Sequence, residues 1–120
     1  MKLREEIYKI QETNITQEEK NAYIHFVGNA FHIITFLWEE SYKDYKEELE
    51  ELVKKIYNAY LEDKTFRMVL TDLAQRTNYG ASSKYLCQLS SKYYDNYFKK
   101  LEEISSKIER SLDNLFKTHN

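Results

Sequence analysis

The side chains best suited to nucleophilic chemistry or metal binding are few in this chain: one cysteine and three histidines, His25, His32 and His119. On a helix, His25 and His32 would lie two turns apart, about 10.5 Å along the axis, which is too far to bind one metal ion directly. Neither lies in a Glu-x-x-His or His-x-x-x-His pattern. We therefore predict no metal site and interpret both as core or seam histidines bonded to a neighbour. Cys87 is the only cysteine, which favours a reducing, cytoplasmic compartment, and we expect its thiol to be a small buried hydrophobe.

Signatures of an enzyme are missing from the sequence. The chain has two glycines, far apart, so no segment can form the glycine-rich loop that holds a phosphate. It has no hydrolase elbow and no local pair of catalytic carboxylates, and its many acidic residues are typical of solvated helix faces. We therefore predict a non-enzymatic protein with no cofactor and no small-molecule substrate.

Eleven tyrosines are the compositional feature that points towards binding. Tyrosine offers a large rigid contact area with a polar tip, which suits protein interfaces and half-buried positions in bundles. Stacking on nucleic-acid bases is the alternative use of such rings. Tyr42, Tyr45 and Tyr60 share an apolar seam, so for these three we expect packing in a core or an interface.

The segment from Leu70 to Leu89 resembles a bacterial helix-turn-helix. It combines a Leu-x-x-Leu-Ala pattern, a glycine and a serine with a following helix that has Leu86 and Leu89 on its inner side. The family places its turn residue where Asn78 stands, whereas Gly80 comes two residues later, so the turn would be longer here. The resemblance implies a DNA-binding regulator using residues 70–92, whose base and phosphate contacts would come from one flank. The residues on that flank are Lys84, Gln88, Ser91, Lys92 and Lys99.

Helices must position all of these residues, because the strongest helix breakers are almost missing. Proline is absent, and Gly28 and Gly80 are the only glycines in 120 residues. Apolar residues recur at spacings of three and four along most of the chain. The sequence predicts an all-α fold: one domain over 1–120, an antiparallel bundle of four to five helices with a long C-terminal helix.

The first three helices are predicted from local signals. Leu3, Ile7 and Ile10 mark a short first helix. Thr16 to Glu19 fits a capping box, which starts a second helix over about 17–40. Ser41 is the expected N-cap of a third helix, although the sequence also allows the second and third to be one bent helix.

Two further helices complete the prediction. Asp63 is the expected N-cap of a fourth, short helix, which should end where Gly80 takes the left-handed conformation. From Ser82 to Thr118 nothing in the sequence stops a helix, which predicts about 35 residues of it, longer than the other helices can cover. Its C-terminal half should either pack along two partner helices in succession or project and pair with another chain. An uncovered apolar seam invites a partner, and a twofold dimer is the commonest solution. The residues predicted to form this protein interface are Tyr93, Tyr97, Leu101, Ile104, Ile108, Leu112 and Leu115.

Charge gives little drive towards nucleic acid or membrane, since the formal net charge is −2. It is unevenly distributed: residues 39–63 carry 9 acidic and 4 basic groups, and residues 64–120 carry 6 and 10. Residues 21–38 lack charge but contain a semi-polar stripe, so we expect a central bundle helix and no membrane contact. We predict a protein–protein interaction module, self-associating as an adaptor, assembly subunit or regulator. DNA binding is the alternative, and an inhibitor whose acidic segment imitates nucleic acid comes third.

Overall fold

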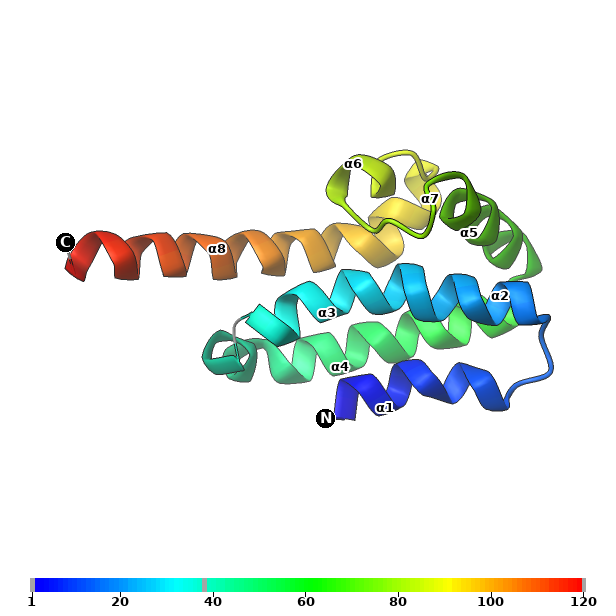
Figure 1. The fold of residues 1–120 in the computed structure, drawn as a ribbon, viewed down its shortest axis with the longest axis horizontal. Coiled ribbons are helices and arrows are strands. Elements are labelled where there is room, and N and C mark those ends of the chain that lie inside the picture. The colour runs from blue at the N-terminus through cyan, green and yellow to red at the C-terminus, as the bar shows by residue number, and fades with distance from the viewer. Residues whose placement is uncertain (1, 38, 120) are drawn as a thin grey trace.

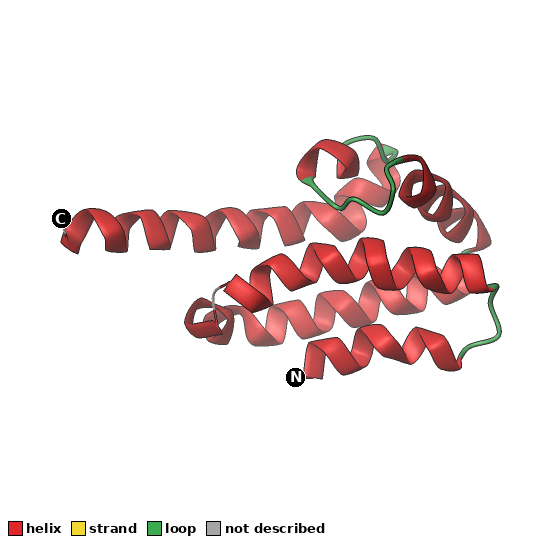
Figure 2. Cartoon of the chain, viewed as in Figure 1, coloured by secondary structure: helices red, strands yellow, loops and turns green. Residues whose placement is uncertain are grey.

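The computed structural model of this protein describes the backbone of residues 2–37 and 39–119. Within those ranges it describes every side chain except those of residues 2, 33–37, 39–43, 111, 112 and 114–119. Helix of one kind or another makes up 85% of the chain, and the described ranges contain no strand (Figure 2). The predicted all-α bundle with a long C-terminal helix is confirmed.

Four helical segments lie side by side in the bundle (Figure 1). α2, η2 and α3 follow one another without a break and form a single rod over residues 17–37, called the α2–α3 rod below. α1 and α4 pack beside this rod, and α8 lies along α3 and α4. The elements are α1 (Lys2–Tyr8), the 3-10 turn η1 (Lys9–Glu12), α2 (Gln17–Ala22), the π-helical η2 (Tyr23–Val27), α3 (Gly28–Leu37), α4 (Glu39–Glu62), α5 (Lys64–Arg76), α6 (Ser83–Leu86), α7 (Ser91–Tyr93), the π-helical η3 (Tyr94–Phe98) and α8 (Lys99–His119).

The second and third predicted helices are separate. α4 turns back and packs against α3, so the two are not one bent helix (Figure 1). Ser41 is not the N-cap, because α4 begins at Glu39 and already includes Ser41. Two glutamates precede Ser41, and acidic residues are favoured in the first turn of a helix by its dipole.

Two predicted helix starts are confirmed by their capping hydrogen bonds. The Glu19 amide donates to the Thr16 hydroxyl at 3.2 Å, and the Thr16 amide donates to the Glu19 carboxylate at 2.9 Å, which completes the capping box of α2. The Phe66 amide donates to the Asp63 carboxylate at 3.2 Å, which caps α5.

The residue predicted to end α5 in the left-handed conformation is wrong. Gly80 does not take the left-handed conformation; Asn78 and Tyr79 do, with φ of 51° and 63°. The Tyr79 amide donates to the Ala74 carbonyl at 2.6 Å and the Asn78 amide to the Gln75 carbonyl at 3.2 Å, which is the Schellman arrangement with asparagine at the left-handed position. Gly80 serves a different purpose, because a Cβ there would meet the Tyr85 ring at 2.8 Å.

The unbroken helix expected from Ser82 to Thr118 is also wrong. α6 stops at Leu86, and a new helical stretch begins at Ser91 and runs through η3 into α8. Ser90 is the N-cap of α7 and is extended, with φ −61° and ψ 154°, but its side chain makes no capping hydrogen bond. Leu86 and Leu89, on the two sides of the end of α6, are both buried.

Candidate functional site

The residues predicted to form a self-association surface are largely covered within the protomer. Leu101, Ile104 and Ile108 are at most 2% exposed, because α8 packs along α3 and α4. Tyr93 is buried and Tyr97 is half-buried, and both rings stack on Phe66, at 4.9 and 4.8 Å between centroids. Their own protomer therefore covers these side chains in this part of the seam, and self-association through them stays a prediction. Leu112 and Leu115 lie outside the described side chains.

The residues predicted to contact DNA are exposed, and the helix break at 87–90 divides them into two groups. Lys84 lies on α6 and Gln88 in the following turn, whereas Ser91, Lys92 and Lys99 lie on the continuous helical stretch of α7, η3 and α8. The helix-turn-helix resemblance requires a recognition helix after the turn, and α6 has only four residues. Lys84 and Lys92 lie over the rings of the tyrosines that follow them, at 5.4 Å in each case.

Three residues predicted to be buried are exposed instead. Cys87 lies in the turn after α6, where the helix breaks, and its side chain is exposed. His25 and His32 lie on the outer side of the α2–α3 rod rather than in the core. The two histidines are seven residues apart and therefore lie on the same face of the rod. That face borders a groove beside α1.

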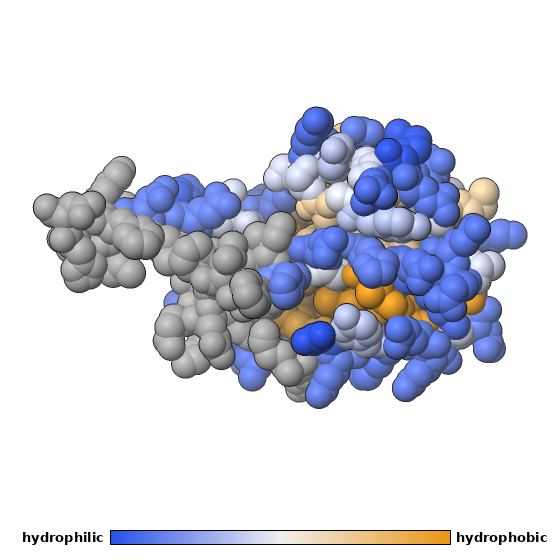
Figure 3. All heavy atoms as spheres, viewed as in Figure 1, coloured by the Kyte–Doolittle hydropathy of each residue, from blue (hydrophilic) through white to orange (hydrophobic). Residues whose placement is uncertain are grey.

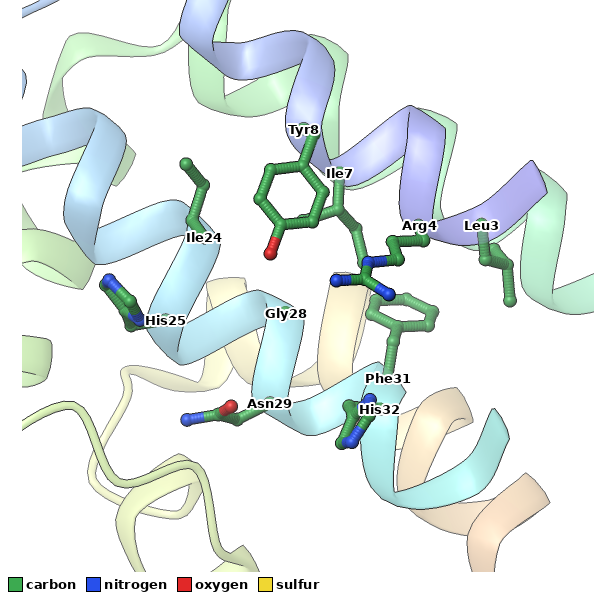
Figure 4. Close-up of a pocket in the computed structure, with 10 residues that line it drawn as sticks. All are labelled: Leu3, Arg4, Ile7, Tyr8, Ile24, His25, Gly28, Asn29, Phe31 and His32. Carbon is green, nitrogen blue, oxygen red and sulfur yellow. The ribbon is translucent and has the colours of Figure 1, made fainter. Parts of the chain in front are cut away.

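This groove lies between α1 and the α2–α3 rod (Figure 4). Its volume is about 410 Å³. Leu3, Ile7 and Phe31 are buried and form the floor, with the partly buried Ile24 beside them. Figure 3 shows apolar atoms exposed along this groove, flanked by polar ones. The remaining lining residues are Arg4, Tyr8, His25, Gly28, Asn29 and His32.

Gly28 keeps the middle of the groove open. Its backbone is ordinary helix, with φ −57° and ψ −44°, so its conformation does not require glycine. A Cβ at this position would lie 3.6 Å from the Ile7 side chain, an ordinary contact, so the packing does not require glycine either. Glycine inside a helix costs about 1 kcal/mol relative to alanine. The fold therefore carries a helix-weakening residue whose one visible effect is to leave space above the groove floor.

The π-helical turn η2 directly precedes Gly28 and sets which side chains face the groove. Tyr23, Phe26 and Val27 of η2 are buried in the core, whereas Ile24 and His25 line the groove. A π turn adds one residue to a helical turn and occurs frequently at functional sites. Its presence in the wall of the groove is a second reason to treat this surface as the candidate site.

The groove has donors but no acids. Its ten lining residues include an arginine, two histidines, an asparagine and a tyrosine, and neither aspartate nor glutamate is among them. The Arg4 guanidinium lies 5.6 Å from the centre of the Tyr8 ring and has no ion pair with a carboxylate of the described residues. Tyr8 is 41% exposed, so this cation–π pair stands at the open rim.

The left-handed turn after α5 closes one edge of the site. The Asn29 side-chain amide donates to the Tyr79 carbonyl at 3.3 Å, and the His25 and Tyr79 rings lie 5.7 Å apart. A positive φ is unusual for an aromatic residue and costs of the order of 1–3 kcal/mol. Two groove residues therefore touch the one turn of the described chain whose non-glycine residues have positive φ.

Comparison with known proteins gives no relative for this chain: no family model, curated protein or solved structure matches it. No group of three or more histidines, cysteines, aspartates and glutamates that could hold a metal ion is found among the residues described. In the same part of the chain, no helix combines the length and the apolar character needed to cross a membrane.

Sequence reasoning missed the groove as a site. Its signals are present in the sequence, in an isolated glycine within a helical seam and a histidine three residues before it. The packing of α1 against the α2–α3 rod is what turns those residues into a hollow, and no local pattern predicts which helix faces that side.

Proposed function

We propose that this protein is a non-enzymatic protein-interaction module, and that the groove between α1 and the α2–α3 rod binds a segment of a partner protein. The observation that supports this most directly is Gly28. A residue that weakens its helix, and that neither backbone nor packing requires, keeps a hollow open on the surface.

The openness of the groove favours a protein segment over a small molecule. Small-molecule pockets bury roughly 70–90% of a ligand's surface. Here Arg4, His25 and Asn29 are exposed along the rim, so a ligand lying on the floor keeps one side uncovered. The body of a partner protein would cover that side. An apolar hollow surrounded by polar groups is also the usual anatomy of an interface hot spot.

This proposal retains the protein partner expected from the sequence and transfers the binding surface from the α8 seam to the groove. DNA binding through residues 70–92 gains no comparable support, because α6, which stands where the recognition helix is expected, is one turn long and a break separates Lys84 from Lys92. The cytoplasmic, reducing setting depends on the single cysteine and stays a prediction.

Selection from a displayed random-peptide library tests the proposal. We expect peptides that bind the unmodified protein and lose binding to Gly28→Leu, whose side chain would occupy the hollow. The matched control is Lys92→Glu, an exposed change on α7 away from the groove, which should bind the same peptides normally. Selected peptides that bind Gly28→Leu as well as the unmodified protein, or a selection that enriches none, would contradict the proposal.

A further inference from the structure

We infer that the partner segment recognised by the groove carries carboxylates on either side of an apolar anchor. This inference depends on the proposed function, since it describes the chemistry of the same binding surface. Three features of the groove support it: the position of its donors, the absence of acids in its lining, and its length.

The donors stand at both ends of the groove, with the apolar floor between them (Figure 4). Arg4 lies towards one end, beside Phe31, and His25 lies towards the other, beside Ile24. Ile7 and Gly28 occupy the middle. An apolar side chain placed above Gly28 would therefore have a donor group on each side of it.

The chemistry of these donors favours carboxylates. A guanidinium can bond a carboxylate through two parallel N–H groups, and these charge-assisted bonds are about twice as strong as neutral ones. Imidazole offers an N–H donor whether neutral or charged. Glu6, the partly buried acid of α1, already pairs with Lys9 at 3.0 Å, so it does not compete for Arg4. A carboxylate of the partner would meet an arginine that has no carboxylate partner of its own among the described residues.

Asn29 adds a contact to the partner's backbone. One of its amide hydrogens is used on the Tyr79 carbonyl, while its side-chain oxygen has no donor among the residues described. That oxygen can accept an N–H from an extended segment lying in the groove. Asn29 would thus orient the segment while Arg4 and His25 select its side chains.

The length of the groove sets the spacing of the carboxylates. Positions 25 and 32 lie about 10.5 Å apart along a helix, and Arg4 lies at the same end of the groove as Phe31 in Figure 4. In an extended chain successive side chains point to opposite faces and each residue rises about 3.3 Å, so two carboxylates that face the groove on either side of one anchor are four residues apart and span about 13 Å, which the flexible glutamate side chains can shorten. The expected motif is Glu-x-x-x-Glu with an apolar residue at the central position.

Two labelled peptides test this inference by fluorescence anisotropy. The acidic peptide is Gly-Glu-Ala-Phe-Ala-Glu-Gly with the label on its N-terminus and an amidated C-terminus, and the neutral one carries glutamine in place of both glutamates. We expect the acidic peptide to bind at least about tenfold more tightly, as two charge-assisted hydrogen bonds would produce, and its affinity to fall as salt is added. Arg4→Gln should reduce this preference to less than about threefold. Lys54→Gln, the same change of charge on an exposed lysine of α4, should leave it unchanged.

The possible outcomes separate this inference from the proposed function. Equal binding of both peptides, lost in Gly28→Leu, would overturn the carboxylate preference and leave the groove as a binding site. Binding of neither peptide, together with a library selection that enriches none, would overturn both. Full displacement of the acidic peptide by decanoate at equal concentration would overturn the protein-segment assignment in favour of a small amphipathic acid.

Discussion

Tyr23 and Tyr60 lie in ring contact in the core, 5.1 Å between centroids, but only one of their hydroxyls is satisfied. The Tyr60 hydroxyl donates to the Glu19 carbonyl at 2.8 Å and bonds the Thr71 hydroxyl at 3.0 Å. The Tyr23 hydroxyl is buried and has no hydrogen-bond partner among the described residues. The Tyr60 hydroxyl therefore joins α4 to α2 and α5, whereas the Tyr23 hydroxyl is buried without a hydrogen bond to the described residues.

Replacing these tyrosines by phenylalanine should change stability in opposite directions. Tyr60→Phe should lower the free energy of unfolding by about 1–2 kcal/mol, because it leaves partners unsatisfied. Tyr23→Phe removes a hydroxyl that is desolvated without compensation, so it should leave stability unchanged or raise it by up to about 1 kcal/mol. Urea unfolding of the two variants measures both, and a Tyr23→Phe loss as large as that of Tyr60→Phe would show that Tyr23 has a partner.

Alkaline pH should reduce the contribution of Tyr60. Burial, only partly opposed by the Thr71 hydrogen bond, raises the pKa of Tyr60 to about 12, above the ordinary value of 10.0. The folded state therefore favours the protonated phenol, so this contribution is complete below about pH 10 and is lost as pH rises towards 12. The stability difference between the unmodified protein and Tyr60→Phe should shrink across that window. A difference that stays constant from about pH 8 to 12 would contradict this assignment.

Arg67 should be one of the most sensitive polar residues of the fold. Its guanidinium donates to the Tyr60 and Leu61 carbonyls at 2.9 and 2.7 Å, which satisfies acceptors in the last turn of α4. It also bonds Glu19 at 3.1 Å, and both side chains are less than 20% exposed. Burial opposes ionisation of Glu19, but hydrogen bonds from Thr16 and Arg67 hold its pKa below the usual value.

Arg67→Leu should therefore cost about 2–4 kcal/mol of stability, and Glu19→Gln about 1 kcal/mol, because the second change leaves both carbonyl bonds in place. The double variant, measured by urea unfolding, should cost less than the sum of the two. Strict additivity would show that Arg67 acts through the carbonyls alone.

Gly28→Ala should stabilise the protein by up to about 1 kcal/mol. Alanine is the better helix former, and the added Cβ has room beside Ile7. Thermal unfolding measures this, with the exposed Ser106→Ala on α8 as a control for helix propensity alone. A destabilised Gly28→Ala would mean that the fold requires the glycine, and the main support for the groove as a binding site would be lost.

Local signals in the sequence predicted the parts of the fold that depend on local bonds. Thr16 and Asp63 cap their helices through residues three positions away, so their patterns are readable without the tertiary structure. The break at 87–90 lacks a strong breaker, so no local pattern marks where α6 ends. The left-handed turn was placed at Gly80, whereas Asn78 performs that role and glycine instead makes room for the Tyr85 ring.

The apolar seam of α8 shows the same limit for predicting a binding surface from the sequence. The spacing of Leu101, Ile104 and Ile108 correctly predicted an apolar face, but the covering surface is the protomer's own α3 and α4. Periodicity reports that a face is buried and does not report what buries it. The groove has no local signature because it depends on how α1 packs against the α2–α3 rod, which the pattern within either helix does not report.

Mapping bound acidic peptide by NMR tests the central claim most directly. Amide chemical shifts of the isotope-labelled protein are followed while the Gly-Glu-Ala-Phe-Ala-Glu-Gly peptide is added. The account predicts that the largest changes fall on Arg4, Ile24, His25, Gly28 and Asn29, and that they disappear in Gly28→Leu. Changes centred on α6, α7 or α8, with the groove residues unaffected, would contradict it.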